Sequence, residues 1–202
     1  MMKKWFVFSF GALALMAFSA AVGPSGYEIG DQAADFSLKG TDGEIHTLAG
    51  MPNAKGYVVI FSCNHCPYVL AYEDRMIALH NKYAPLGYPV VAINPNDKKI
   101  QPADSYEKMV ERARDKAFPF AYLYDETQEV AKAFGATRTP HVYLLDQNRV
   151  VRYIGAIDDN SEDPEAVGER YLENAIEALR TGRTPDPAQT KAIGCTIKWK
   201  KN

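Results

Sequence analysis

Short continuous runs of apolar residues alternate along this chain with longer segments whose apolar residues recur at helical spacing. The runs at 57–61 and 88–93 are rich in β-branched and aromatic residues, as expected of strands buried on both faces. The segments 67–83 and 103–117 carry their apolar side chains on one helical face. This alternation predicts an α/β fold with a mostly parallel central sheet and helices on both faces.

Two pairs of short strands add antiparallel elements to this pattern. Residues 36–38 and 45–48 flank Asp42-Gly43, whose left-handed turn geometry is typical of a hairpin. Residues 141–145 and 149–154 are joined by a turn-rich linker and predict an antiparallel hairpin at the edge of the sheet. The remaining expected elements are a strand at 121–124, a helix ended by Gly135 and a last helix over 164–181.

The first 22 residues differ from the rest of the chain. Two lysines precede an almost wholly apolar stretch, and small residues at 19–21 offer a cleavage site, as in a secretory signal peptide. The alternative is an uncleaved membrane anchor over residues 5–22, which are just long enough to span a bilayer. Either segment predicts export, to the periplasm or the extracellular space. It would be followed by one domain over 27–182 and a C-terminal tail over 183–202.

Composition and charge narrow the classes of partner. The 202 residues include 23 lysines and arginines and 25 aspartates and glutamates, for a net charge of −2. No basic stripe with interleaved aromatic residues occurs in the sequence, so nucleic acid is not an expected partner. An apolar fraction of 47% is enough for a packed core.

The tetrapeptide Cys63-Asn64-His65-Cys66 lies between the strand at 57–61 and the helix at 67–83. The free N–H groups and the dipole of the helix N-terminus favour a thiolate on the first cysteine, and the second is close enough to form a disulfide with it. We therefore expect Cys63 to be the nucleophile and Cys66 the resolving thiol.

Two alternative interpretations of this motif are weaker. A structural bridge across two intervening residues closes a very short loop and stabilises the fold little. A zinc site would need a second Cys/His pair at ligand spacing, which the sequence lacks. We expect no metal and no other cofactor.

Four further residues are candidates for the same site. His65, between the thiols, would favour the reduced thiolate and make the disulfide more oxidising, or it is only an exposed turn histidine. Thr139-Pro140 begins a central strand, where proline removes a ladder hydrogen bond. We expect a cis peptide there, opposite the thiols, whose backbone binds an extended substrate strand. His141 is either a base or copper ligand beside the thiols or a packed strand residue.

The tail adds a third cysteine. Cys195 is either a further redox thiol, paired with the Cys-X-X-Cys motif or with another chain, or a cysteine without redox function near Ile197 and Trp199. No spacing argument selects a proton acceptor for Cys66 among the carboxylates near predicted strand ends. These carboxylates are Asp97, Asp125 and Glu126.

From residue 29 to 155 the chain resembles the thioredoxin-like redoxin superfamily, in its alkyl hydroperoxide reductase/thiol-specific antioxidant branch. The matching pieces are Asp35-Phe36-Ser37-Leu38 with Asp42-Gly43, Phe61-Ser62-Cys63 with the Cys-X-X-Cys motif, and the run from Phe134 to Pro140 with the strand after it. The resemblance implies a thioredoxin-like fold, a Cys63–Cys66 redox couple and a cis Thr139-Pro140 peptide facing it.

Departures from the pattern bear on the substrate. Ser62 stands where thioredoxins usually have tryptophan, and Asn64-His65 replaces their Gly-Pro dipeptide. A histidine directly before the second cysteine looks like the oxidising DsbA-type centres, although their helical insertion is not evident in this sequence. Gly56 and Ile60 occupy positions where peroxiredoxins have proline and threonine, which weakens a peroxidase assignment.

The first functional hypothesis is an exported thiol–disulfide oxidoreductase that exchanges disulfides with protein substrates through Cys63 and Cys66, together with a redox partner protein. Its direction, oxidant or reductant, depends on a potential that the sequence does not determine. One alternative is an antioxidant thiol peroxidase that uses Cys63 and is resolved by Cys66 or Cys195. The other is a copper-handling protein that uses Cys63, Cys66 and His141.

Overall fold

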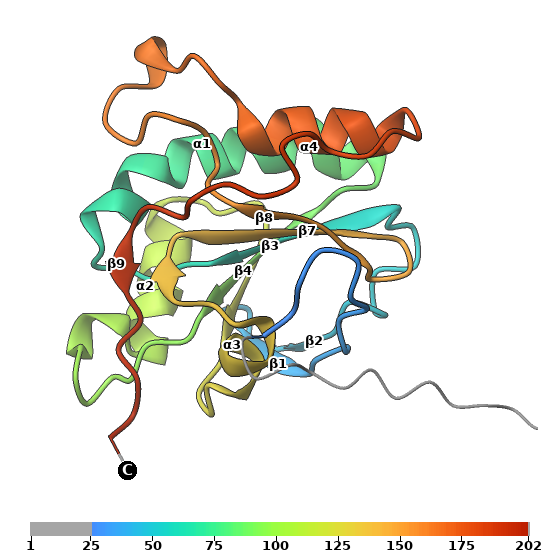
Figure 1. The fold of residues 1–202 in the computed structure, drawn as a ribbon. Helices are drawn as coiled ribbons and strands as arrows, with labels where there is room; N and C mark the ends of the chain where they lie inside the picture. The colour runs from blue at the N-terminus through green and yellow to red at the C-terminus, as the bar shows by residue number, and fades with distance from the viewer. Residues whose placement is uncertain (1–25, 202) are drawn as a thin grey trace, which may run out of the picture.

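The computed structural model describes residues 26–201, so the signal peptide or anchor expected over residues 1–22 lies outside the described residues. Within that range the main sheet has seven strands in the order β2-β1-β5-β4-β3-β7-β8 (Figure 1). In this order the strands are β2 (Ile45–His46), β1 (Leu38–Gly40), β5 (Ala121–Tyr124), β4 (Val90–Asn94), β3 (Gly56–Phe61), β7 (His141–Asp146) and β8 (Val151–Gly155).

The central strands β5, β4 and β3 run parallel, and the flanking pairs are antiparallel. The predicted hairpin β7–β8 forms one edge of the sheet, and the predicted hairpin around Asp42-Gly43 forms the other as β1–β2. The expected α/β fold, with parallel strands at its centre and an antiparallel hairpin at the edge, is confirmed.

Helices cover both faces of the sheet (Figure 1). One core cluster joins alternate strand residues to α1 (Pro67–Tyr83), α2 (Tyr106–Asp115) and α4 (Tyr171–Arg180). The opposite cluster joins the other strand residues to α3 (Glu129–Phe134) and to the segment that begins at Tyr27. Because successive strand side chains point to opposite faces, β3 supplies Val58 and Ile60 to the first cluster and Val59 and Phe61 to the second.

The helix after the cysteine motif begins at Pro67 and ends at Tyr83, as predicted. The prediction for 164–181 is wrong in its first half, since α4 begins only at Tyr171. Residues 164–166 form a separate 3-10 turn, where the Asp163 carboxylate accepts the Glu165 N–H. The Gly168 N–H donates to Asp159 instead of to a helical carbonyl, so the two segments do not join into one helix.

The predicted helix at 103–117 also divides into two elements. Residues Pro102–Asp104 form a 3-10 turn, and α2 follows with Ser105 at its N-cap. The Ser105 hydroxyl accepts the Lys108 N–H, which satisfies one of the free donors at the helix start. This break places Asp104 at the end of the turn rather than inside a helix.

The C-terminal tail returns across the domain to the end of the sheet where the cysteine motif lies (Figure 1, red). It first pairs with the edge strand β8, where the Ile154 N–H donates to Ala188 and the Thr190 N–H donates back to Ile154. Its short strand β9 (Cys195–Thr196) then pairs antiparallel with β6 (Arg138–Thr139), and Ile197 is buried in the second core cluster.

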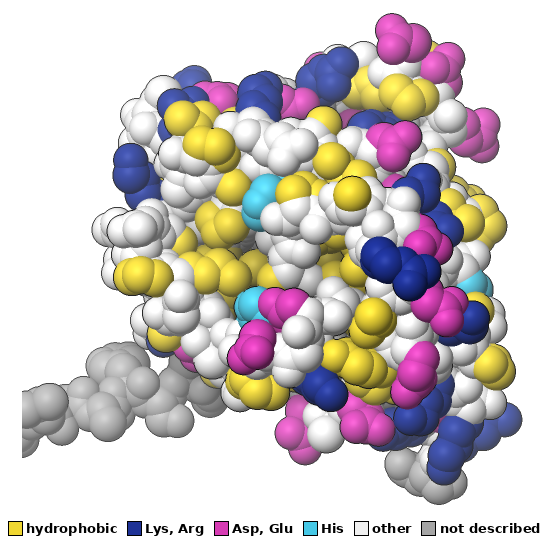
Figure 2. Space-filling view, turned by 180° about the vertical axis from the view of Figure 1, so that it is seen from behind, with side chains coloured by type: hydrophobic (Ala, Val, Ile, Leu, Met, Phe, Trp, Pro, Cys, Tyr) yellow, Lys and Arg dark blue, Asp and Glu magenta, His cyan; other side chains and the backbone are white. Residues whose placement is uncertain are grey.

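Two observations concern the surface. Among residues 26–201, no helix combines the length and the apolar character that crossing a bilayer requires. On the face shown in Figure 2, lysines and arginines are interspersed with aspartates and glutamates, and apolar side chains line the hollow at its centre.

Candidate active site

Strand β3 and helix α1 position the first cysteine. The β3 ladder continues as far as Ser62, whose N–H donates to Ile93 over 2.7 Å, and the chain then turns through the motif into α1. The Cys63 side chain is buried, and its Sγ lies 3.2 Å from the Thr139 hydroxyl. The N–H groups of His65 and Cys66 also face this sulfur, as expected at a helix N-terminus.

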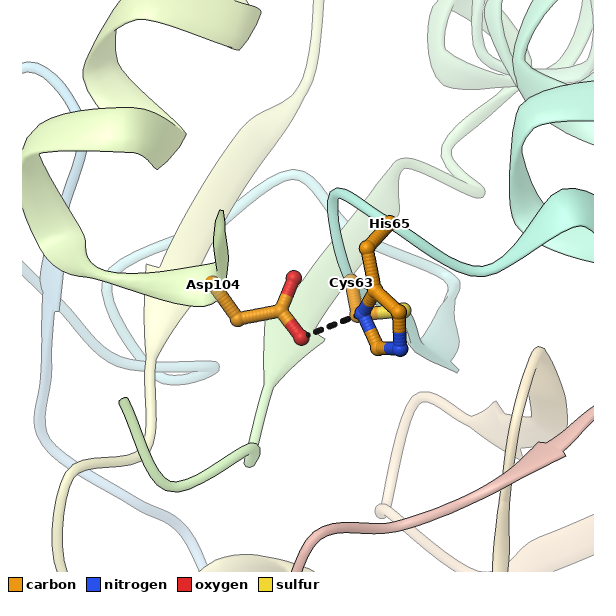
Figure 3. Close-up of side chains that lie close together, drawn as sticks. All are labelled: Cys63, His65 and Asp104. Carbon is orange, nitrogen blue, oxygen red and sulfur yellow. Dashed lines mark hydrogen bonds and ion pairs between the residues drawn. The ribbon is translucent and has the colours of Figure 1, made fainter. Parts of the chain in front are cut away.

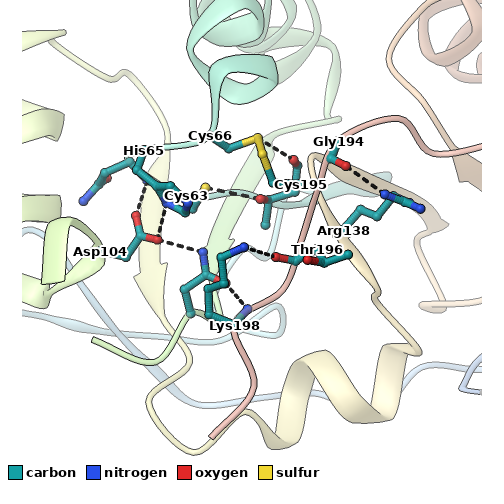
Figure 4. The surroundings of a disulfide bond; sticks show 12 residues. Cys63, His65, Cys66, Asp104, Arg138, Gly194, Cys195, Thr196 and Lys198 are labelled. Carbon is teal, nitrogen blue, oxygen red and sulfur yellow. Dashed lines mark hydrogen bonds and ion pairs between the residues drawn. A yellow bond between two sulfur atoms is a disulfide. The ribbon is translucent and has the colours of Figure 1, made fainter. Parts of the chain in front are cut away.

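The disulfide joins Cys66 to Cys195, whereas the resemblance implied a Cys63–Cys66 pair (Figure 4). The Cα atoms of Cys66 and Cys195 are 6.0 Å apart, within the normal span of a disulfide. The pairing follows from the tail, because β9 places Cys195 directly opposite Thr139, and Cys66 Sγ lies 3.2 Å from the Thr139 carbonyl oxygen. Of the alternatives for Cys195, the structure therefore shows the one in which it forms a disulfide with a cysteine of the Cys-X-X-Cys motif.

The Thr139-Pro140 peptide is cis, as predicted. Its position opposite the thiols is also confirmed, since Thr139 contacts Cys63 through its hydroxyl and Cys66 through its carbonyl. The residue before the cis-proline therefore touches both sulfurs of the motif.

Burial dominates the ionisation of Cys63. It raises the pKa of the thiol to about 11, and the nearby negative charge of Asp104 acts in the same direction. The Thr139 hydroxyl and the N–H groups of Cys66 and His65 oppose this rise in pKa, but they are the smaller effects. In this state Cys63 is a neutral thiol at pH 7, whereas the helix N-terminus alone would favour the thiolate.

A buried carboxylate organises the motif (Figure 3). Asp104 is fully buried, and its Oδ2 lies 2.6 Å from His65 Nδ1. It also accepts the Asn64 backbone N–H and an N–H of the Asn96 amide, each over 2.7 Å. Because the carboxylate accepts this hydrogen bond, Nδ1 is the ring nitrogen that carries the proton, and in that tautomer the lone pair is on Nε2.

Cys63, His65 and Asp104 form a compact group, since one polar or sulfur atom of each lies within 4.8 Å of the others. The His65 side chain is 19% exposed and held by Asp104, so it is not the exposed turn histidine of the alternative interpretation. A thiol, an imidazole and a carboxylate that orients the imidazole are the parts of a proton-transfer relay that activates a nucleophile.

Asp104 was not among the carboxylates considered from the sequence. Of those three, Asp97 accepts the Lys99 N–H within a local turn, and Asp125 accepts the Ala131 N–H in α3. Glu126 is exposed. None of these contacts involves a cysteine.

Comparison with known proteins identifies the family. Residues 29–154, more than half of the chain, match the AhpC/TSA family. The chain belongs to the AhpC/TSA family. Membership makes it a thioredoxin-like thiol redox protein, which confirms the resemblance inferred from its motifs. A search of curated proteins found no match.

The solved structures that are similar to this chain include two with substantial sequence identity. An uncharacterized conserved protein from Geobacillus kaustophilus is 40% identical, with a TM-score of 0.81 over 87% of this chain and 94% of its own. A hypothetical protein from Sinorhizobium meliloti 1021 is 34% identical, with a TM-score of 0.82 over 87% and 97%. The peroxidoxin BcpB from Mycobacterium tuberculosis is 22% identical, with a TM-score of 0.58 over 77% and 98%, and supports the fold alone.

His141 of this AhpC/TSA protein lies outside the group formed by Cys63, His65 and Asp104. Its ring packs on Tyr143, and its Nδ1 accepts the Thr137 N–H over 3.4 Å. It faces a separate cavity of about 660 Å³ between the start of the domain and the tail. Among the described residues, the Cys63, Cys66 and His141 set of the alternative copper hypothesis is therefore not assembled, and His141 is a packed strand residue.

Burial of His141 predicts a loss of stability in acid. Burial lowers the pKa of His141 to about 4, and the positive charge of Arg138 adds a smaller decrease in the same direction. The unfolded chain binds a proton at this residue below about pH 6.5, and the folded chain does so only near the lowered value. Stability should therefore fall as the pH falls through this window, by up to about 3 kcal/mol.

Urea denaturation of wild type and His141→Gln between pH 7 and pH 4 measures this loss. The glutamine carbonyl can still accept the Thr137 N–H, so the variant should fold and should lose less stability on acidification. An equal loss in both proteins would assign the acid sensitivity to other groups.

Proposed function

We propose that this protein is a thiol–disulfide oxidoreductase that acts on protein substrates, with Cys63 as nucleophile and Cys66 as resolving thiol. One observation carries the proposal: β6, immediately before the cis-proline, already pairs with an extended segment that presents a cysteine to the motif. A protein substrate in extended conformation would meet the same backbone donors and acceptors. A small peroxide would need none of them.

The reaction has two exchange steps. The Cys63 thiolate attacks one sulfur of the substrate disulfide, and the other substrate sulfur leaves and takes up a proton. The Cys66 thiolate then attacks Cys63 Sγ, which releases the first substrate sulfur and forms the Cys63–Cys66 disulfide. A ring nitrogen of His65 lies within 4.8 Å of Cys63 Sγ, so the imidazole would accept the Cys63 proton through water, while Asp104 holds the ring and its tautomer.

Export is part of the proposal, and it rests on the signal-like residues 1–22. An oxidising compartment suits a chain that carries a long-range disulfide. The cycle also needs a second protein that restores the thiols, so a redox partner protein is proposed with it. The antioxidant peroxidase remains the runner-up, because the Thr139 hydroxyl beside Cys63 could hydrogen-bond a peroxide.

Replacing Cys63 by serine should reduce the catalysed reduction of insulin disulfides by dithiothreitol to the uncatalysed rate. The expected loss is at least about 10³-fold, because a hydroxyl at this position is not ionised at pH 7 and cannot form the mixed disulfide. Ser62→Ala is the matched control, since it changes the neighbouring buried residue and leaves the three cysteines and the His65–Asp104 pair in place.

Turnover by Cys63→Ser at the wild-type rate would contradict the nucleophile assignment. Consumption of hydrogen peroxide with a higher kcat/KM than insulin reduction would instead favour the peroxidase.

A further inference from the structure

We propose that the C-terminal strand occupies the place of a substrate strand on β6, and that Cys195 is a third redox thiol that competes with Cys63 for Cys66. The inference rests on the proposed function and adds a regulatory closed state to it. In the closed state Cys66 is bonded to Cys195 and Cys63 is a buried thiol. In the open state Cys63 and Cys66 form the disulfide and the tail thiol is free.

The tail binds as a peptide substrate would. Thr139 pairs with Cys195 and Arg138 with Thr196, and the Ile197 N–H donates to the Thr137 carbonyl over 3.2 Å. The Arg138 guanidinium donates to the Gly194 carbonyl over 2.9 Å. A second strand can add to β6 on this side only if β9 leaves, because β9 already uses these backbone groups.

At Gly194 the tail lies tightly against the backbone of Thr139. A Cβ atom there would lie 2.2 Å from the Thr139 carbonyl oxygen and 2.6 Å from its carbonyl carbon. Both are backbone atoms next to the cis-proline, so they cannot rotate away. The strand fits because this residue has no side chain, and we infer that a competing substrate strand fits best with a small residue immediately before its cysteine.

The three cysteines lie together in the core, as a direct exchange among their sulfurs requires. Cys63, Cys66 and Val69 form one buried cluster, and Cys195 packs against it. Cys63 loses its proton, its sulfur attacks Cys66 Sγ, and the Cys63–Cys66 bond forms as the Cys66–Cys195 bond breaks. Cys195 leaves as a thiolate and takes up a proton. One disulfide and one thiol are present before and after, so no external oxidant or reductant is consumed.

A short hydrogen-bond chain links the tail to the imidazole of the motif (Figure 4). The Lys198 N–H donates to the Asn96 amide oxygen over 2.8 Å, and the Asn96 amide donates to Asp104, which in turn holds His65. Movement of the tail would therefore disturb the carboxylate that positions the imidazole. Tail position and the state of the nucleophile are coupled through these contacts.

The test compares the full-length wild-type protein with the variant Gly194→Ala. Both proteins contain all three cysteines. Proteins equilibrated in glutathione buffers are quenched in acid and alkylated, and their disulfides are mapped by peptide mass spectrometry. Wild type should contain mainly Cys66–Cys195 with Cys63 alkylated. The added methyl group should shift the ratio at least about tenfold toward Cys63–Cys66 with Cys195 alkylated, because a displacement that costs 1.4 kcal/mol already changes an equilibrium tenfold.

Gly50→Ala is the matched control, because its added methyl group would meet only Thr47, in the loop that follows the edge strand β2. A Gly194→Ala ratio equal to that of Gly50→Ala would overturn the closed-state proposal. If Gly194→Ala does not fold, Arg138→Ala removes the guanidinium contact with the tail and should shift the ratio in the same direction.

The two proposals can fail separately. If insulin reduction requires Cys63 but neither tail variant changes the ratio of the two disulfide isomers, the oxidoreductase proposal is supported and the closed-state proposal is wrong. If the isomers shift but insulin is not reduced, the tail is a redox switch and the proposed substrate class is wrong.

Discussion

Replacing Cys195 by serine is expected to lower the free energy of unfolding of the oxidised protein by about 3 kcal/mol, from the loss of a long loop closure. The Cys66–Cys195 disulfide joins residues 129 positions apart. The chain-entropy relation gives about 5 kcal/mol for a loop of that length and about 2 kcal/mol for the short loop within the Cys-X-X-Cys motif. In the variant, oxidation can form only the disulfide of the short loop, and the difference is lost.

Thermal unfolding with and without a thiol reductant measures this effect. For a domain of this size the loss corresponds to roughly 6–12 °C in Tm. Reduction should lower the Tm of wild type by more than it lowers the Tm of Cys195→Ser, because only wild type loses the long-range cross-link. Equal melting of the two oxidised proteins would mean that wild type, too, carries its disulfide within the Cys-X-X-Cys motif.

Local parts of the site could be predicted from the sequence because neighbouring residues determine them. Pro67 has its φ preset for a first helical position and Cys66 precedes it as N-cap, so the start of α1 and the presentation of the motif followed from the five residues 63–67. The cis Thr139-Pro140 peptide was predicted from its place before a strand, and its contacts with both sulfurs agree with that place.

The parts of the site that depend on contacts between distant residues could not be predicted in this way. Asp104 reaches His65 because β4 ends beside β3 and the chain then makes a 3-10 turn, and no residue spacing encodes that approach. Three cysteines allow three pairings, and the sequence offers no rule to choose among them. The choice is made by β9, which pairs with β6 rather than continuing away from the domain.

Removing the Asp104 carboxylate is expected to destabilise the protein strongly. Asp104→Ala leaves the Asn64 N–H, the His65 ring N–H and the Asn96 amide without their acceptor in a buried site. The expected cost is about 3–5 kcal/mol, because each buried donor that loses its partner costs about 1–3 kcal/mol and the site can relax in part. Asp104→Asn keeps one acceptor oxygen and should cost about 1–3 kcal/mol.

Chemical denaturation at pH 7 measures both losses. Asp97→Asn is the control, because that buried carboxylate lies on the same stretch of chain and accepts the Lys99 N–H in a local turn. A cost for Asp104→Ala no larger than that of the control would mean that water or a rearranged side chain replaces the carboxylate.

The isosteric variant also tests how Asp104 acts on the nucleophile. Its negative charge raises the pKa of Cys63, so Asp104→Asn should lower that pKa from about 11. Each unit of decrease makes about ten times more thiolate at any pH below the pKa, and the alkylation rate of Cys63 at pH 8 should rise accordingly. A slower reaction would show the opposite: that Asp104 helps the thiolate by sustaining a positive charge on His65. In that case the carboxylate serves the exchange step, in which Cys63 must ionise, more than the closed state, in which Cys63 is held as a thiol.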